Sequence, residues 1–243
     1  PQMKSAEGKT LLKSEYKKLK TKLEELSGKT VTVDSLKKAV AIVNNKRAAV
    51  QRLARLRSAD PAPISGLDSL LINQVFFYDN PVRFTDSVNK ICDELETRIN
   101  QGTGVYPTRT TRLLVSGCPM AVPNWKVPAI VEGLNAVIVG EESCVGERGF
   151  RGEVSASGET IEELMDAVVD RYQQIDCAIF TPNHERLEHI KEMAAKYKAD
   201  GVLLCGLNFC TPYLMESLNV EKELESNGIP ALRIETDYSQ EDV

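Results

Sequence analysis

Cysteine is the residue type in this chain that is best suited to chemistry. The six cysteines are Cys92, Cys118, Cys144, Cys177, Cys205 and Cys210. Cys118, Cys144 and Cys210 each follow a short apolar run, and their numbers differ by 26 and 66. A thiolate is both a nucleophile and a ligand for soft metal ions. Three thiolates from separate loops can hold an iron–sulfur cubane and leave one iron open to substrate or solvent.

The spacing alone leaves two interpretations open. The sequence has no Cys-x-x-Cys pair, and Cys205 with Cys210 forms only an isolated Cys-x4-Cys. The cysteines are therefore either metal ligands, with Cys205 as a further candidate, or buried residues that line an ordinary α/β crevice. Buried packing is the expected role of Cys92 and Cys177.

Zinc is a weaker candidate than iron. His184 and His189, the two histidines, are five residues apart, about 140° around a helix, and cannot share a metal ion.

The rest of the composition is ordinary: 243 residues, 42% apolar, with a net charge of −5. No apolar run reaches the roughly 18 residues of a membrane span, and no segment reads as a signal peptide. We therefore expect a cytoplasmic protein, whose thiols stay reduced. Residues 1–58 carry 15 basic and 5 acidic side chains, but their lysines alternate with leucines as on a solvated amphipathic helix. Neither nucleic acid nor a membrane is expected as a partner.

Five short apolar runs alternate with helix-length amphipathic segments in the second half of the chain. They are Arg112–Ser116, Ala136–Gly140, Cys177–Thr181, Gly201–Cys205 and Pro230–Glu235. This alternation predicts a doubly wound, Rossmann- or flavodoxin-like α/β fold with a parallel sheet. Ligands bind such sheets at the carboxyl ends of the strands, where Cys118, Cys144 and Cys210 would meet. Cys205 ends a strand and could reach this edge, whereas Cys177 begins one and is expected at the opposite edge.

The first part of the chain reads as helical. Leu11–Leu26 is closed by Gly28, Asp34–Arg57 has Asp34 as its N-cap, and a third region from about Ser65 to Asn100 is interrupted at Asn80-Pro81. We expect a helical bridging segment over residues 1–105 and an α/β domain over residues 106–243.

Further helix starts are predicted in the α/β part. Thr160 with Glu163 forms a capping box, Asn183 caps the next helix, and Thr211 precedes a proline at the first helical position. Because the sequence opens at Pro1 and closes at Val243 after a strand-like run, we expect it to be part of a longer polypeptide.

Charged residues also fall at the predicted strand ends. Glu141, Glu142, Glu147 and Asp237 either position a substrate or are solvated carboxylates, and solvation is the commoner case. Arg148 could neutralise a cluster, bind the phosphates of an acyl-CoA, or pair with Glu147. The glycine-rich motifs that cradle phosphates, G-x-G-x-x-G after the first strand and Walker A, do not occur.

Several motifs together resemble a known family. They are Gly117-Cys118-Pro119, Glu142-Ser143-Cys144-Val145-Gly146-Glu147-Arg148, Asn208-Phe209-Cys210-Thr211-Pro212, and Gly228-Ile229-Pro230 with Glu235-Thr236-Asp237-Tyr238. Over roughly residues 30–243 the chain resembles the second half of the 2-hydroxyacyl-CoA dehydratase and benzoyl-CoA reductase family. Residues 117–128 and 141–148 are most similar to its double-cubane reductase branch.

This resemblance implies an oxygen-sensitive iron–sulfur enzyme. The cluster would be [4Fe-4S] or a double cubane, with Cys118, Cys144, Cys210 and Cys205 as ligand candidates and Arg148 as a cofactor-binding residue. An ATP-hydrolysing activator would supply low-potential electrons for dehydrating or reducing an acyl-CoA or another small substrate.

The resemblance also bears on assembly. It implies a homodimer or a heterodimer with a related subunit, and a first domain, absent from this sequence, that brings the remaining ligands. We therefore expect the chain alone to be inactive. The alternative is a non-enzymatic α/β interaction module with structural cysteines.

Overall fold

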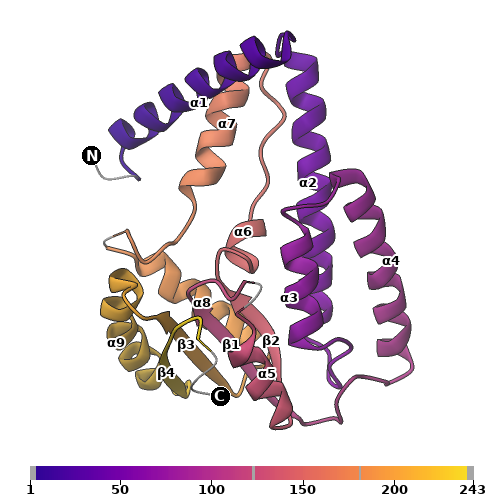
Figure 1. Ribbon diagram of the computed structural model, residues 1–243. Coiled ribbons are helices and arrows are strands. Elements are labelled where there is room, and N and C mark those ends of the chain that lie inside the picture. Colours follow the sequence, from indigo (N-terminus) through magenta and orange to yellow (C-terminus); the bar gives the residue numbers. More distant parts are fainter. Residues whose placement is uncertain (1–3, 122–123, 181, 240–243) are drawn as a thin grey trace. The chain divides into compact units, whose positions relative to one another are not determined.

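The computed structural model describes residues 4–121, 124–180 and 182–239 (Figure 1). The helices are α1 (Ala6–Ser27), α2 (Val33–Leu56), α3 (Gly66–Val75), α4 (Pro81–Asn100), α5 (Lys126–Gly133), α6 (Glu147–Phe150), α7 (Ile161–Gln173), α8 (His184–Lys196) and α9 (Thr211–Ser226). The strands are β1 (Thr111–Gly117), β2 (Ala136–Glu142), β3 (Gly201–Leu207) and β4 (Ala231–Thr236). The chain forms two compact units, residues 1–47 with 152–175 and residues 48–151 with 176–243.

The first unit joins a basic helix to an acidic one. Lys13 Nζ lies 2.8 Å from an Asp166 carboxylate oxygen, and Lys17 Nζ lies 2.8 Å from Glu162, so lysines of α1 face carboxylates of α7. As predicted, α1 ends at Gly28, in the left-handed region at φ 64°, and α7 begins with the Thr160 capping box.

The second unit is built on a four-stranded sheet in the order β2-β1-β3-β4, in which every neighbouring pair is parallel. Four of the five predicted strands are therefore confirmed. Helices cover both faces, so the predicted doubly wound α/β fold is also confirmed.

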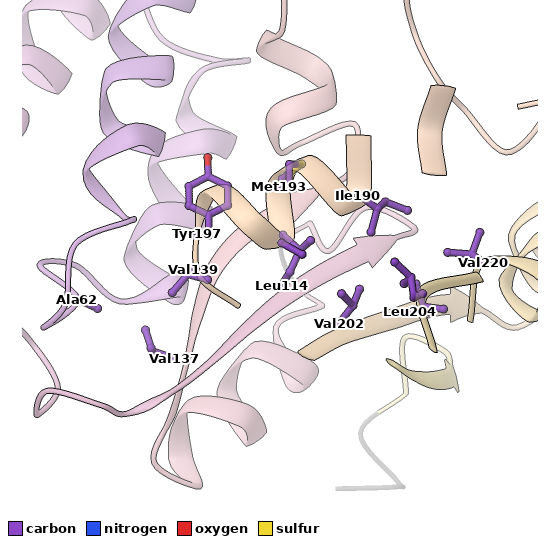
Figure 2. Packing of buried hydrophobic residues seen from close by; sticks show 12 residues of the cluster. Ala62, Leu114, Val137, Val139, Ile190, Met193, Tyr197, Val202, Leu204 and Val220 are labelled. Carbon is purple, nitrogen blue, oxygen red and sulfur yellow. The ribbon is translucent and has the colours of Figure 1, made fainter. Parts of the chain in front are cut away.

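Alternating side chains divide the sheet into two cores. Leu114, Val139 and Val202 pack with residues of α8 and α9, including Ile190 and Val220 (Figure 2). Their neighbours along the strands turn to the other face, where Val115, Ile138 and Leu203 pack with Leu70 of α3 and Val127 of α5. This two-residue period is the geometry of a strand that is buried on both faces.

A third core joins helices of the second unit. Val50 and Leu53 of α2 pack against Val88 and Cys92 of α4, and Phe150 of α6 completes the group. Cys92 is fully buried there, and burial raises its thiol pKa to about 11. Its predicted role as a packing residue is confirmed.

The predicted strand at Cys177–Thr181 is wrong. Residues 177–180 form a turn in which Phe180 N donates to Cys177 O at 3.0 Å, while Thr181 lies outside the described residues. Ile179 is 69% exposed, although an interior strand of a parallel sheet is buried on both faces.

Two predicted helix caps differ from the structure. Thr32, not Asp34, caps α2, since its hydroxyl accepts from Ser35 N at 3.2 Å. The N-cap of α9 is Cys210, with Thr211 already helical. Asn183 is the N-cap residue of α8 as predicted, although its side chain makes no capping bond. Within the described ranges, no helix has the length and apolar character needed to cross a membrane.

Candidate functional site at the carboxyl edge of the sheet

The carboxyl ends of the strands bring three cysteines to one edge. Cys118 directly follows β1, Cys144 comes two residues after β2, and Cys210 lies three residues after β3. Gly117 makes the first of these turns possible. It has φ 133°, and a Cβ there would lie 2.1 Å from the carbonyl oxygen of Cys205, so the backbone passes directly against β3.

Cys118 and Cys210 lie together. Cys118 is 5% exposed, and the partly buried Cys210 packs against it. Leu207 N donates to Cys118 Sγ at 3.4 Å. Burial raises the pKa of Cys118 to about 11 despite this hydrogen bond, so the thiol is protonated at neutral pH.

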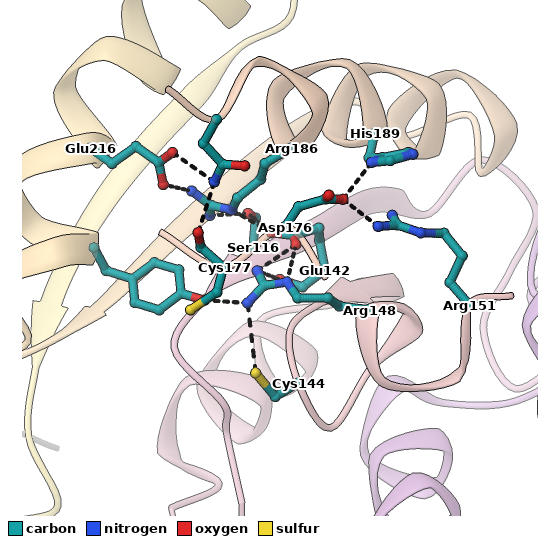
Figure 3. A network of polar contacts seen from close by, with 12 residues as sticks. Ser116, Glu142, Cys144, Arg148, Arg151, Asp176, Cys177, Arg186, His189 and Glu216 are labelled. Atoms are coloured by element: carbon teal, nitrogen blue, oxygen red, sulfur yellow. Dashed lines mark hydrogen bonds and ion pairs between the residues drawn. The ribbon is translucent and has the colours of Figure 1, made fainter. Parts of the chain in front are cut away.

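Cys144 is connected to that pair through two other side chains (Figure 3). It is exposed, and Arg148 Nη1 lies 3.7 Å from its sulfur. The same guanidinium donates to the Tyr213 hydroxyl, and Tyr213 packs with Cys118 and Cys210 in a small buried group. Arg148 and Tyr213 therefore connect Cys144 to the Cys118–Cys210 pair.

A buried ion network centred on Glu142 supports this edge (Figure 3). Arg148 Nε donates to one Glu142 oxygen at 2.7 Å, and Arg186 Nε donates to the other at 3.1 Å. Ser116 donates its hydroxyl to Glu142 at 2.6 Å, and Arg186 also pairs with Glu216. The two guanidiniums and two carboxylates balance in charge.

The network changes the interpretation of the charged residues at the strand ends. Arg148 pairs with Glu142 and not with Glu147, and neither Glu142 nor Glu141 is solvated. Glu141 forms a buried two-point pair with Arg57 at 2.6 and 2.7 Å. These carboxylates are therefore structural anchors.

The protonation states of this network are held by charge pairing. Burial alone would lower the pKa of Arg148, but the Glu142 carboxylate and the Tyr213 oxygen outweigh it and raise the pKa. Burial raises the pKa of Tyr213, opposed in part by Arg148. Arg148 stays charged and Tyr213 stays neutral at physiological pH.

The remaining two cysteines occupy different places. Cys205 lies within β3 among the apolar residues facing α3 and α5, and burial raises its pKa to about 12. The expectation that Cys177 lies at the opposite edge is wrong. Its carbonyl accepts from Asn183 at 3.0 Å, and its side chain lies beside the Arg148 network (Figure 3).

Sequence reasoning missed Arg186 and Tyr213. Arg186 lies 44 residues after Glu142 along the chain, and no local spacing signals their contact. Tyr213 follows the Cys-Thr-Pro motif and could have been noticed there as the first large side chain of α9. Both guanidiniums lie over its ring, with Arg148 Cζ at 5.6 Å and Arg186 Cζ at 5.0 Å from the centroid.

The donor set suits iron in chemical type but not in arrangement. Thiols are the ligands of iron–sulfur clusters. Within residues 4–121, 124–180 and 182–239, however, no three cysteine, histidine or carboxylate side chains are grouped closely enough to hold a metal ion. The arrangement described does not by itself fit a cluster.

The chain is an α/β protein with a parallel sheet. Its thiols and its buried charge network lie at the carboxyl ends of the strands, where such sheets bind their ligands. The family model for 2-hydroxyglutaryl-CoA dehydratase, D-component, matches residues 1–243, and the chain belongs to this family. The resemblance inferred from the cysteine motifs is thereby confirmed.

The similar proteins are subunits of dehydratases and reductases. A putative dehydratase subunit, YjiM, of Escherichia coli is 31% identical over 97% of this chain, and the (R)-phenyllactyl-CoA dehydratase beta subunit of Clostridium sporogenes is 27% identical over 95%. A benzoyl-CoA reductase subunit of Thauera aromatica is 23% identical over 89%. The chain spans 55 to 60% of the length of these relatives.

Proposed function

We propose that this chain is part of a cytoplasmic iron–sulfur enzyme that dehydrates or reduces an acyl-CoA or another small substrate. The observation that supports the proposal is the position of Cys118, Cys144 and Cys210 after three neighbouring parallel strands. An ATP-hydrolysing activator supplies the electrons, and the enzyme is completed by a second copy of the chain or by a related subunit. Relatives named as subunits of dehydratases and of a reductase support this assignment.

The proposed ligands are Cys118, Cys144 and Cys210, with Cys205 as the weaker candidate, for a [4Fe-4S] or double-cubane cluster. Because no three donors are grouped in the described part of the chain, cluster binding requires further donors or a rearrangement of the edge. In the domain organisation that we propose, residues 1–105 bridge to such a further domain and residues 106–243 form the α/β domain. Arg148 would place a positive charge beside the cluster or a bound phosphate.

One observation favours the alternative, a non-enzymatic interaction module. Burial raises the pKa of Cys118 to about 11 and that of Cys205 to about 12, which suits protonated packing thiols better than metal-bound thiolates.

Iron and acid-labile sulfide analysis with electron paramagnetic resonance, on the anaerobically reconstituted intact polypeptide, distinguishes these functions. We expect Cys210→Ser to lose iron per folded molecule, while Cys92→Ala, in the helical core, keeps it. Cys92 is a better control than Cys177, because Cys177 lies beside the candidate site. Equal iron in both variants, or none in the unsubstituted polypeptide, would contradict the cluster proposal.

A further inference from the structure

We propose that Cys118 and Cys210 form a reversible disulfide within one chain when the chain is free of metal and is exposed to a peroxide. The inference concerns two of the proposed cluster ligands, but it does not depend on a cluster being bound.

The first support is the contact between the two cysteine side chains. Disulfide formation needs the two sulfur atoms to be neighbours before reaction, since bridging distant cysteines requires backbone movement. The Cys118 and Cys210 side chains pack together in one small group with Tyr213.

The second support is that one turn holds both cysteines. Leu207 N donates to the sulfur of Cys118 at 3.4 Å, while Leu207 O accepts from the backbone of Cys210 at 2.9 Å. Cys210 O also accepts from Leu214 N at 3.1 Å in the first turn of α9. The turn between β3 and α9 therefore fixes Cys210 and at the same time positions the Cys118 thiol.

The third support is the difference in exposure. Cys210 is partly exposed, whereas Cys118 is buried, so a small oxidant reaches Cys210 first. Cys144 is also exposed, but its sulfur lies against Arg148, with Tyr213 between it and the pair. Cys205 is the competing partner, since it lies near Cys118 but faces the apolar core under α3 and α5.

The reaction balances with hydrogen peroxide as the oxidant. The Cys210 thiolate attacks one peroxide oxygen and the O–O bond breaks. Cys210 becomes a sulfenic acid, and hydroxide is released. The Cys118 thiol loses its proton as it attacks Cys210 Sγ, the S–O bond breaks, and the departing hydroxide takes up that proton and leaves as water. Overall, two thiols and one peroxide give one disulfide and two waters, with two electrons passing from sulfur to oxygen.

The test is a peptide map of the metal-free chain under non-reducing conditions. The chain is reduced with dithiothreitol, treated anaerobically with one equivalent of hydrogen peroxide, alkylated and digested. We expect alkylatable cysteines to fall from six to four, and one linked peptide pair containing Cys118 and Cys210 to appear and be lost on reduction. A Cys118–Cys205 link, a link between two chains, or six alkylated cysteines would overturn the inference.

Two variants sharpen the result. Cys210→Ser should abolish the loss of two alkylatable cysteines, and Cys144→Ser, which removes a more exposed thiol, should leave the linked pair intact. Circular dichroism shows whether each variant is folded. The peptide map of the unsubstituted chain tests the proposal even if a variant fails to fold. Iron content of the intact polypeptide is a separate measurement, so failure of cluster binding and failure of disulfide formation are told apart.

Discussion

At the scale of single residues, Glu142 holds the carboxyl edge of the sheet together. Its two oxygens accept from Arg148, Arg186 and Ser116, all of them buried. A buried charge is tolerated when it is paired and hydrogen-bonded, and losing one partner leaves the others uncompensated. The Glu142 carboxylate therefore holds Arg148 in its position beside Cys144.

We expect Glu142→Gln to lower the free energy of unfolding by about 3 to 5 kcal/mol, because two buried guanidiniums lose their shared carboxylate. Urea unfolding followed by circular dichroism measures the change. Glu94→Gln is the matched control, since Glu94 pairs with Arg98 on the surface of α4 and should cost less than about 1 kcal/mol. Similar losses in the two variants would show that the network adds no stability of its own.

Glu147 should make stability depend on pH. Burial raises its pKa above 4.5, with Lys196 and Arg57 opposing the shift, and Oε1 is buried without a hydrogen-bond partner among the described residues. The folded chain thus holds this proton more tightly than the unfolded chain. The stabilisation from this group is present below pH 4.5 and is lost as pH rises through the folded pKa.

Glu147→Gln removes this titration. The unfolding free energy of the variant, relative to that of the unsubstituted chain, should therefore rise as the pH increases from 4.5 through the raised pKa of Glu147 in the folded chain. Denaturant unfolding at several pH values measures the difference, and a difference that is constant with pH would refute the assignment.

At the scale of elements, the sequence predicts strands well where burial is two-sided. The runs of β1, β2 and β3 alternate between two apolar cores, and their β-branched composition reflects that environment. The edge strand β4 is largely exposed and adds only the partly buried Ala231 and Ile234 to these cores. The Cys177–Thr181 run is apolar too, but it ends beside Pro182, and Ile179 is exposed although Ala178 is buried, so the run is not covered on both sides. The cysteine positions followed from the strand ends, whereas the Glu142–Arg186 contact depends on tertiary packing that no local pattern encodes.

Gly117 should be intolerant of a side chain. A Cβ there would collide with the Cys205 carbonyl oxygen at 2.1 Å, and φ 133° is strained for any other residue. We expect Gly117→Ala to cost about 2 to 4 kcal/mol by separating β1 from β3. Gly133→Ala, at the end of α5 with open space around its Cα, should change stability by less than about 1 kcal/mol. Thermal unfolding compares the two, and equal melting temperatures would exclude a close-approach role.

At the scale of the whole molecule, the chain is a family member that spans 55 to 60% of the length of its relatives. The described residues supply thiols at one edge but no group of three metal donors. Ligands divided between domains assemble poorly from one part, because the remaining positions stay open to solvent and oxygen.

We therefore expect this 243-residue chain, produced in air, to contain no stoichiometric iron or acid-labile sulfide. Colorimetric iron and sulfide assays of the purified chain measure this. A full complement of both in the aerobic sample would show that the chain assembles a cluster without further domains.

One of the two outer strands of the sheet, β4, has a consequence for handling the protein. In the described part of the chain β4 pairs on one side with β3, so its other side presents unpaired backbone groups. Such strands recruit other molecules into fibrous aggregates unless they are short or charged. β4 has six residues, and its Arg233 is paired with Glu221 at 2.6 Å, while Leu232 beside it is 58% exposed. A substitution of Arg233 that leaves the exposed Leu232 on this open edge without a neighbouring charge should therefore shorten the shelf life of concentrated samples.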